Sequence, residues 1–196
     1  IVFLVIGVAI GGATGALSAK RFKVETIAGP RIGRDNRWLL ALTGGVLSGI
    51  AAQIANAGVP VLLLDIVPKD ATDRSVIAKS AIDKLLKADP APLMSKAAAK
   101  LITAGNIEDD LDQLSDVDWI VEAIIEDLAA KQALFKSLET ICAPTTVLAS
   151  NTSSISITAI ASALTRPENV VGMHFFNPAP IMPLVEVVSG HLTSND

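Results

Sequence analysis

One of the two histidines in this chain stands at the end of an apolar run. His174 lies in the stretch VVGMHFFNPAP, residues 170–180, directly before two phenylalanines and an Asn-Pro pair. An unperturbed imidazole titrates near pH 6.5, so it can accept a proton at neutral pH. His174 is therefore a candidate catalytic base at the mouth of a sheet, and the alternative is a core histidine with satisfied hydrogen bonds. The other histidine, His191, is predicted to lie on the surface.

Polar side chains also accompany the ends of three other apolar runs. Asp65 ends VPVLLLD, Glu122 and Glu126 lie in and just after DVDWIVEAI, and the polar residues 151–154 follow TTVLAS. In an open sheet of parallel strands, ligands bind in the crevice outside the carboxyl ends of the strands. These residues and His174 therefore predict one ligand site at one edge of a sheet.

The apolar runs alternate with segments of helical spacing. Short apolar runs predict strands at 38–42, 59–65, 116–124, 145–151, 169–176 and 183–188, and periodicity predicts helices at 50–58, 73–88, 93–102, 128–141 and 155–164. Gly58 is expected to end the first helix. Buried strands separated by helices are typical of a parallel sheet. The sequence therefore predicts an α/β fold with a Rossmann-type, doubly wound, mostly parallel sheet.

The N-terminal segment IVFLVIGVAIGGATGAL has 17 uncharged residues and precedes Lys20, Arg21 and Lys23. This length is the lower limit for a membrane span. Membrane attachment is nevertheless the less favoured interpretation, against a buried strand-turn-helix piece or a remnant of an upstream domain. Residues 22–37 are typical of a polar linker. We expect an unassigned segment at 1–37 and the nucleotide-binding domain at 38–196, in a chain that lacks an initial Met and can be a fragment.

The composition favours a globular protein with a sizeable core, because 51% of the residues are hydrophobic and 18% are charged. The net charge of −4 argues against a nucleic-acid surface. A single cysteine, Cys142, excludes internal disulfide bonds and cysteine metal clusters, and it agrees with a reducing, cytoplasmic setting. Cys142 is expected in the core rather than as a reactive thiol. No metal site is predicted.

Asp65 stands where a dinucleotide-binding fold places its ribose-binding acid. It ends the second predicted strand, 21 residues after Gly44. An acid at this position accepts hydrogen bonds from the adenine ribose hydroxyls and repels the additional phosphate of NADP. The following residues, Ile66 and Val67, offer no arginine to that phosphate. The sequence therefore favours NAD, and a turn or helix-capping aspartate is the alternative.

The glycine loop LTGGVLSG departs from the G-x-G-x-x-G pattern. Counted back from the helix, Gly44 keeps the second position, whereas Leu42 and Leu47 occupy the first and third. Gly45 and Gly49 are near but out of register. A leucine at the third position is expected to push the helix away from the strand and to weaken pyrophosphate binding. The helix N-terminal amides would still attract the pyrophosphate.

From about Trp38 to its end, the chain resembles the NAD-binding domain of the 3-hydroxyacyl-CoA dehydrogenases, which are enzymes of fatty-acid β-oxidation. The matching stretches are IAAQIANAGVPVLLLDIVP, DWIVEAIIEDLAAKQALF, ASNTSSISITAIA and VVGMHFFNPAPIMPLVEVV. The combination of SNTSS, GMHFFNP and LVEVV is far more specific than a glycine motif alone. The stretch KADPAPLMSKAAAKLITAGNIEDDL is similar to the branch that also carries an enoyl-CoA hydratase.

The resemblance implies that a 3-hydroxyacyl-CoA gives a hydride from C3 to NAD and its hydroxyl proton to a base. His174 matches the family's base and Glu186 its acidic partner, while Ser153 and Asn177 match donors near the oxygen at C3. The implied cofactor-binding residues are Gly44, Gly45, Gly49, Asp65, Glu126, Lys131 and Asn151. Simpler roles are also open: a surface charge for Glu186, a helix cap for Ser153 and a solvated side chain for Lys131.

The chain departs from the family in three places. Its glycine loop is altered, Pro183 stands where the family has a lysine, and the sequence stops at Asp196 before the all-helical domain that completes the cleft and the dimer. Two hypotheses follow: a dehydrogenase domain, or an inactive Rossmann-like module for binding or assembly. For the intact protein, the resemblance implies a homodimer or part of a multifunctional complex.

Overall fold

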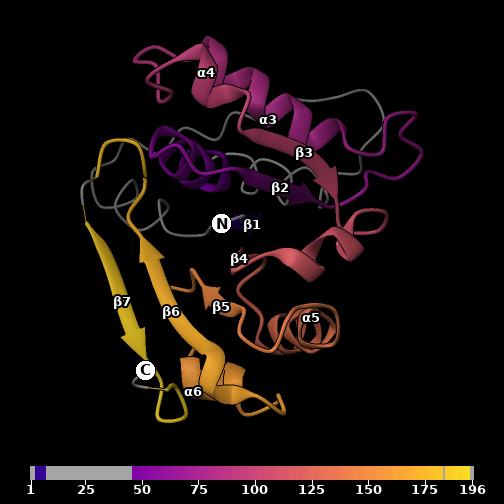
Figure 1. Ribbon diagram of the computed structural model, residues 1–196, viewed down its shortest axis with the longest axis vertical. Helices are drawn as coiled ribbons and strands as arrows, with labels where there is room; N and C mark the ends of the chain where they lie inside the picture. The colour runs from indigo at the N-terminus through magenta and orange to yellow at the C-terminus, as the bar shows by residue number, and fades with distance from the viewer. Residues whose placement is uncertain (1–2, 8–45, 183, 195–196) are drawn as a thin grey trace, which may run out of the picture.

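A single mixed sheet organises the residues that the structure describes, which are 3–7, 46–182 and 184–194 of this computed structural model. Within this part of the chain, the sheet has seven strands in the order β3-β2-β1-β4-β5-β6-β7 (Figure 1). Their bounds are Phe3–Gly7 for β1, Val61–Asp65 for β2, Ile102–Asn106 for β3, Trp119–Ala123 for β4, Val147–Ser150 for β5, Val170–Phe175 for β6 and Val185–Ser189 for β7. All neighbouring pairs are parallel except β6 and β7, which are antiparallel. The predicted doubly wound α/β fold is confirmed.

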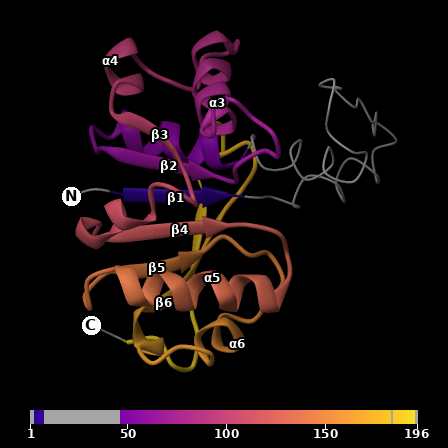
Figure 2. The ribbon, with the colours of Figure 1, turned by 90° about the vertical axis from the view of Figure 1, so that its right-hand side faces the viewer.

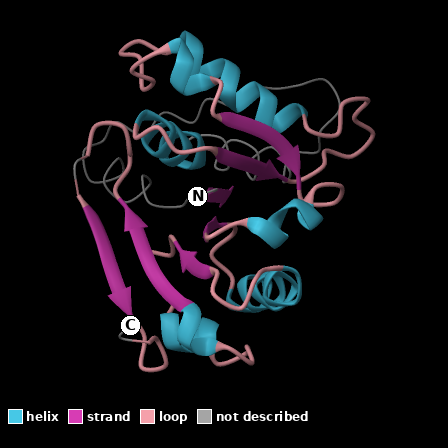
Figure 3. Cartoon of the chain, viewed as in Figure 1, coloured by secondary structure: helices cyan, strands magenta, loops and turns pink. Residues whose placement is uncertain are grey.

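Helices cover both faces of the sheet, as the magenta strands and cyan helices of Figure 3 show. Residues 46–56 and α3 (Val76–Lys87) belong to one hydrophobic core, together with Val61 and Leu63 of β2. The other core contains α5 (Leu128–Ile141), α6 (Ile157–Ala161) and Leu62 and Leu64 of β2. Because successive side chains of a strand point to opposite faces, an apolar run such as VLLLD supplies both cores at once.

Strand β1 places residues 3–7 within the sheet. These residues lie in the middle of the sheet and pair in parallel with β2 on one side and β4 on the other (Figure 2). The sequence alone leaves these residues unassigned, with a buried strand-turn-helix piece among the interpretations considered. The strand expected at 38–42 lies outside the described residues, and so do residues 1–2 and 8–37. Across the described residues, we find no helix with the length and apolar character needed to cross a membrane.

The region between α3 and β4 is the second difference from expectation. A helix was expected at 93–102, but α4 spans only Lys96–Ala99 and the chain then enters β3. The last three residues of β3, Ala, Gly and Asn, have low strand propensity, and pairing with β2 stabilises the strand. A Cβ on Gly105 would come within 2.6 Å of Leu64 Cδ2 and 2.7 Å of Asp110 Oδ2, so a larger residue here would require these two side chains to shift. Among the described residues, two short 3-10 helices lie at Leu111–Asp116 and Pro167–Asn169.

Gly58 ends the first described helix, as the sequence predicts. Its φ of 82° lies in the left-handed region that glycine adopts without a Cβ penalty. The chain can therefore turn directly from the helix at 46–56 into β2. This turn places Asp65, the last residue of β2, at the carboxyl edge of the sheet together with the ends of β4, β5 and β6.

Candidate active site

A pocket of about 290 Å³ opens beside the end of β6. Its walls come from the loop after β5, the start of α6 and the two strands of the β6–β7 hairpin. Ser153, His174 and Glu186 line one part of it, and Thr158, Val188 and Gly190 line another. Three residues of the predicted site therefore lie in one cavity.

The antiparallel pairing of β6 and β7 brings His174 and Glu186 together. The two residues are register partners, and cross-strand partners in antiparallel strands lie within side-chain contact. His174 Nδ1 lies 2.9 Å from Glu186 Oε2, with 22% of the histidine side chain and 51% of the glutamate side chain exposed. A carboxylate at Nδ1 favours the tautomer with the proton on Nδ1. Nε2 is then the nitrogen that can accept a proton.

Ser153 approaches His174 from the other side. Its Oγ lies 3.1 Å from His174 Nε2, so the serine hydroxyl donates to this nitrogen in the tautomer that Glu186 favours. The helix-capping role considered for Ser153 belongs instead to Ser156, whose Oγ accepts from Ala159 N at the start of α6. The Ser153 side chain thus does not cap α6, and it lines the pocket.

Asn151 connects the ends of β5 and β6. Its Oδ1 accepts a hydrogen bond of 2.7 Å from Phe175 N, and the residue is buried. This contact fixes the backbone beside His174. The cofactor contact expected of Asn151 stays a prediction. Asn177, expected near the oxygen at C3, is exposed in the loop that follows β6.

Glu126 follows β4 and reaches across to the loop after β5. Its Oε1 accepts from Ser154 N at 3.2 Å, from Ser154 Oγ at 3.0 Å and from the Thr152 hydroxyl. Partial burial raises the pKa of Glu126, but the Thr152 hydroxyl, the Lys131 ammonium and Ser154 outweigh it, and the net pKa is lowered. Glu126 therefore remains an anion at neutral pH.

Lys131 is not the solvated helix lysine that its sequence allows. It lies on α5, which begins after the cap of Asp127 Oδ1 on Ala130 N, and its side chain is only 1% exposed. The Lys131 ammonium lies 2.6 Å from Glu122 Oε1 and 3.4 Å from Glu126 Oε2. Its expected contact with the cofactor stays a prediction. The contact with Glu122 was not predicted, and its signal was a glutamate inside the apolar strand WIVEA.

Asp65 is buried at the end of β2, and within the described residues its carboxylate accepts one hydrogen bond, from Ile66 N at 2.8 Å. Burial raises the pKa of Asp65 to about 6, against the opposing effect of the Ile66 amide. A desolvated carboxylate with acceptor capacity left fits the two hydroxyls of a ribose. This observation agrees with the predicted adenine-ribose role.

The glycine loop is only partly described. Gly44 and Gly45 lie outside the described residues, and Gly49 lies within the helix at 46–56. A Cβ on Gly49 would meet Pro180 Cδ at 3.1 Å, so this glycine allows the loop after β6 to approach the helix. Leu47, expected to push the helix away, is buried in the core. The cofactor contacts of the three glycines stay predictions.

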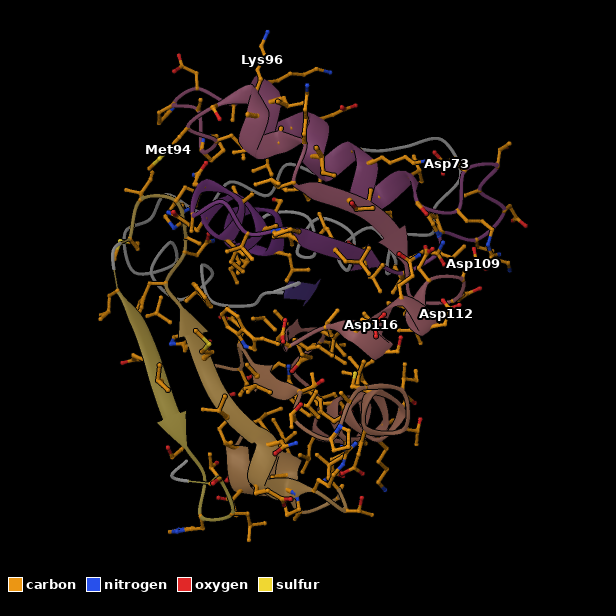
Figure 4. The ribbon with its side chains drawn as sticks, viewed as in Figure 1. Asp73, Met94, Lys96, Asp109, Asp112 and Asp116 are labelled. Carbon is orange, nitrogen blue, oxygen red and sulfur yellow. The ribbon has the colours of Figure 1, made fainter. Side chains whose placement is uncertain are left out.

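The side chain of Arg74, in the segment after β2, forms ion pairs with two carboxylates. Arg74 Nε lies 2.6 Å from Asp109 Oδ2 and its Nη2 2.8 Å from Glu108 Oε2. Figure 4 shows Asp73 and Asp109 on the same side of the molecule, near the ends of β2 and β3, with Asp112 and Asp116 beyond them. Among the described residues, no group of three or more His, Cys, Asp or Glu side chains could hold a metal ion.

Comparison with known proteins decides the family. Residues 43–196 match the model of the 3-hydroxyacyl-CoA dehydrogenase NAD-binding domain. This chain belongs to the 3-hydroxyacyl-CoA dehydrogenase family. The predicted family and its cofactor, NAD, are thereby confirmed.

Several known proteins resemble the chain. A probable 3-hydroxyacyl-CoA dehydrogenase of Deinococcus radiodurans is 46% identical over 143 residues, which are 72% of this chain and 41% of that protein. A fatty acid oxidation complex subunit alpha of Pseudomonas syringae is 36% identical, over 92% of this chain and 25% of the subunit. The crystal structure of 3-hydroxybutyryl-CoA dehydrogenase from Escherichia coli K12 is 38% identical and superposes with a TM-score of 0.66, over 77% of this chain and 32% of that one. The chain thus spans less than half the length of each of these proteins.

Proposed function

We propose that this chain carries the cofactor-binding half and the catalytic base of an NAD-dependent 3-hydroxyacyl-CoA dehydrogenase of fatty-acid β-oxidation. The observation that supports this most is the row of Ser153, His174 and Glu186, with contacts of 3.1 Å and 2.9 Å to the two ring nitrogens. A row of hydroxyl, imidazole and carboxylate is suited to removing a proton from an alcohol.

The reaction oxidises the C3 alcohol of the substrate to a ketone. NAD, when bound, supplies the acceptor for the hydride that leaves C3. His174 Nε2 accepts the hydroxyl proton, while Glu186 holds Nδ1–H and stabilises the imidazolium that forms. General base assistance of this kind contributes roughly 10²–10⁴ in rate. The imidazolium then returns its proton to water through the pocket.

Ser153 has a second task in this proposal. Its hydroxyl donates to Nε2 in the structure, and the substrate hydroxyl takes that place when it binds. Ser153 can then donate to the oxygen at C3, together with the exposed amide of Asn177. Two donors at this oxygen orient the substrate and stabilise its developing charge.

The surroundings of Asp65 support a preference for NAD over NADP. The carboxylate itself suits a ribose diol, and Arg74 is engaged by Asp109 and Glu108. An additional phosphate at the ribose would therefore meet negative charge and a paired arginine. Hydrogen bonds from the ribose hydroxyls stabilise the ionised carboxylate, so cofactor binding is expected to lower the pKa of Asp65.

The substrate and the partners of the intact protein follow from the same proposal. The substrate is a 3-hydroxyacyl-CoA, and the intact protein is a homodimer or a part of a multifunctional β-oxidation complex. A fatty acid oxidation complex subunit among the similar proteins supports the second assembly. A reducing, cytoplasmic compartment is part of the same proposal, and the single cysteine Cys142 agrees with it.

Calorimetric titration of the purified chain with NADH, and with NADPH as control, tests the cofactor half. We expect micromolar binding of NADH and much weaker binding of NADPH. Reduction of acetoacetyl-CoA by NADH then tests the reaction. A folded chain that binds neither nucleotide would favour the alternative, an inactive Rossmann-like binding or assembly module.

A further inference from the structure

The Lys131 ammonium is enclosed by oxygen atoms of β4 and of the segment after it. Nζ lies 2.6 Å from Glu122 Oε1, 3.3 Å from the Ile124 carbonyl oxygen and 3.4 Å from Glu126 Oε2. A lysine ammonium has three N–H donors, so these oxygens can engage all of them. The cation is therefore fixed in position between the two glutamates.

Glu122 is completely buried in the central part of the sheet. Besides Lys131, its carboxylate accepts from Ile124 N at 2.5 Å and from Ser150 Oγ at 2.6 Å. Burial raises the pKa of Glu122, although the Lys131 ammonium, Ser150 and the Ile124 amide act against it. Through these contacts one carboxylate connects α5, β4 and the end of β5.

Stability alone is a weak reason for such a pair. Removing two charges from water costs several kcal/mol per ion, and apolar side chains of similar volume often stabilise a core as well or better. A buried ion pair therefore suggests a requirement for position. The group that Lys131 contacts on the side nearer to solvent is Glu126, whose side chain is 24% exposed.

Glu126 connects Lys131 to the loop at 152–154, which carries Ser153. Its Oε2 faces Lys131, and its Oε1 is held by Thr152 and Ser154, the two neighbours of Ser153. Thr152 Oγ1 also accepts from Ile155 N at 2.9 Å, which closes the loop. Ser153 is thus presented to His174 from a loop whose flanking residues are both bound to Glu126.

We propose that Lys131, paired with Glu122, is a positioning residue: it fixes Glu126, and through Glu126 it holds the 152–154 loop with Ser153 against His174. The role rests on the proposed function, since it supports the base of that reaction. Lys131 acts from within the protein and does not touch the substrate.

The test compares three variants of the chain. Lys131→Met removes the cation, and Lys136→Met removes an exposed lysine of the same helix as a matched control. The double variant Glu122→Leu/Lys131→Met replaces the pair by apolar side chains, which is expected to keep the core folded. It still leaves Glu126 without its cation, so it separates positioning from stability even if Lys131→Met does not fold.

Amide hydrogen exchange, followed by NMR, reports on the loop directly. Ser154 N donates to Glu126 and Ile155 N to Thr152, so both amides measure whether the loop is held. In the double variant we expect their exchange to rise about tenfold or more, as for the loss of a hydrogen bond to a charged group, while exchange within β5 is unchanged. The Lys136→Met control is expected to match the wild type.

Turnover provides the second measurement. The double variant is expected to lower kcat for the acyl-CoA reaction about tenfold, because Ser153 is displaced from His174. The exchange at Ser154 and Ile155 separates this cause from loss of the cofactor contact predicted for Lys131. Wild-type exchange at Ser154 and Ile155 in the double variant would overturn the proposal and leave the pair a structural element. If exchange rises but the wild type does not bind NADH, the positioning role is supported and the proposed function is contradicted.

Discussion

Two acid–base pairs lie near the same edge of the sheet, and they differ in their access to solvent. His174 and Glu186 join β6 to β7 with 22% and 51% of their side chains exposed, whereas Lys131 and Glu122 join α5 to β4 with 1% and 0% exposed. The hairpin lies at the end of the sheet, and β4 lies in its interior, beneath α5. Position in the sheet therefore decides which pair can exchange protons with a ligand and which can only hold other groups in place.

The largest effect is expected at the open pair. His174→Ala should lower kcat for 3-hydroxyacyl-CoA oxidation by roughly 10²–10⁴, the usual contribution of a general base. Stability should change little, because the side chain is partly exposed. Steady-state kinetics measures the loss, and His191→Ala, at an exposed position, is the matched control. Wild-type activity in the His174 variant would place the base elsewhere.

The same Glu→Gln substitution in the two pairs sharpens the contrast. Glu122→Gln should lower the free energy of unfolding by about 3–5 kcal/mol, because it leaves the Lys131 ammonium buried without its closest counter-charge. Urea denaturation measures this difference. A loss below about 1 kcal/mol would show that the buried charges are compensated in another way.

Glu186→Gln should behave in the opposite manner. We expect kcat/KM to fall roughly 10²-fold, because a ring that is no longer oriented by a carboxylate presents Nε2 less accurately. The free energy of unfolding should change by less than about 0.5 kcal/mol, as is usual for an exposed side chain. The hypothesis fails if this variant loses stability but retains its kcat/KM.

Asp65 tests the cofactor end of the same edge. Burial raises its pKa from 3.8 to about 6, so the native state binds the proton more tightly than the unfolded state. The stability contributed by the protonated form is therefore lost as the pH rises from about 4 to about 6, by on the order of 3 kcal/mol. Asp65→Asn should remove this part of the slope in urea titrations at a series of pH values. An unchanged slope would contradict the raised pKa.

The smallest effect is expected where the helix at 46–56 meets the loop after β6. Gly49→Ala adds a methyl group 3.1 Å from Pro180 Cδ, and the crowding offsets the gain in helix propensity of about 1 kcal/mol. The net change in unfolding free energy should thus be under about 1 kcal/mol in a urea titration. A larger loss would indicate that the loop cannot shift.

Most strands could be predicted because uniform apolar runs mark a sheet that is buried on both faces. Two strands, β1 and β3, were not predicted, each for its own reason. FLVIG, which forms β1, lies in an apolar segment that also suits a membrane span. The apolar run at 38–42 was predicted as the first strand instead. ITAGN, which forms β3, is not a uniform apolar run, because Ala, Gly and Asn follow its two β-branched residues, and its conformation depends on pairing with β2.

The positions of candidate site residues were predictable where they depend on local pattern. His174 could be found from its place at the end of an apolar run, and Asp65 from its distance to the glycine loop. Glu186 needed a family resemblance, because its contact depends on the register of two antiparallel strands. The burial of Lys131 depends on packing between α5 and β4. The spacing of residues along one helix does not predict this packing.

The antiparallel edge strand also determines how the site tolerates change. All five residues of β7 are exposed, so no buried side chain fixes its register, and a slip by one residue would place Val185 or Val187 opposite His174. The turn beyond β7 supplies the missing anchor: Thr193 Oγ1 donates to Val170 O, and His191 N donates to Thr158 Oγ1. Insertions in the loop between β6 and β7 are thus compatible with the site, whereas a single inserted residue between Glu186 and this turn would separate the base from its carboxylate.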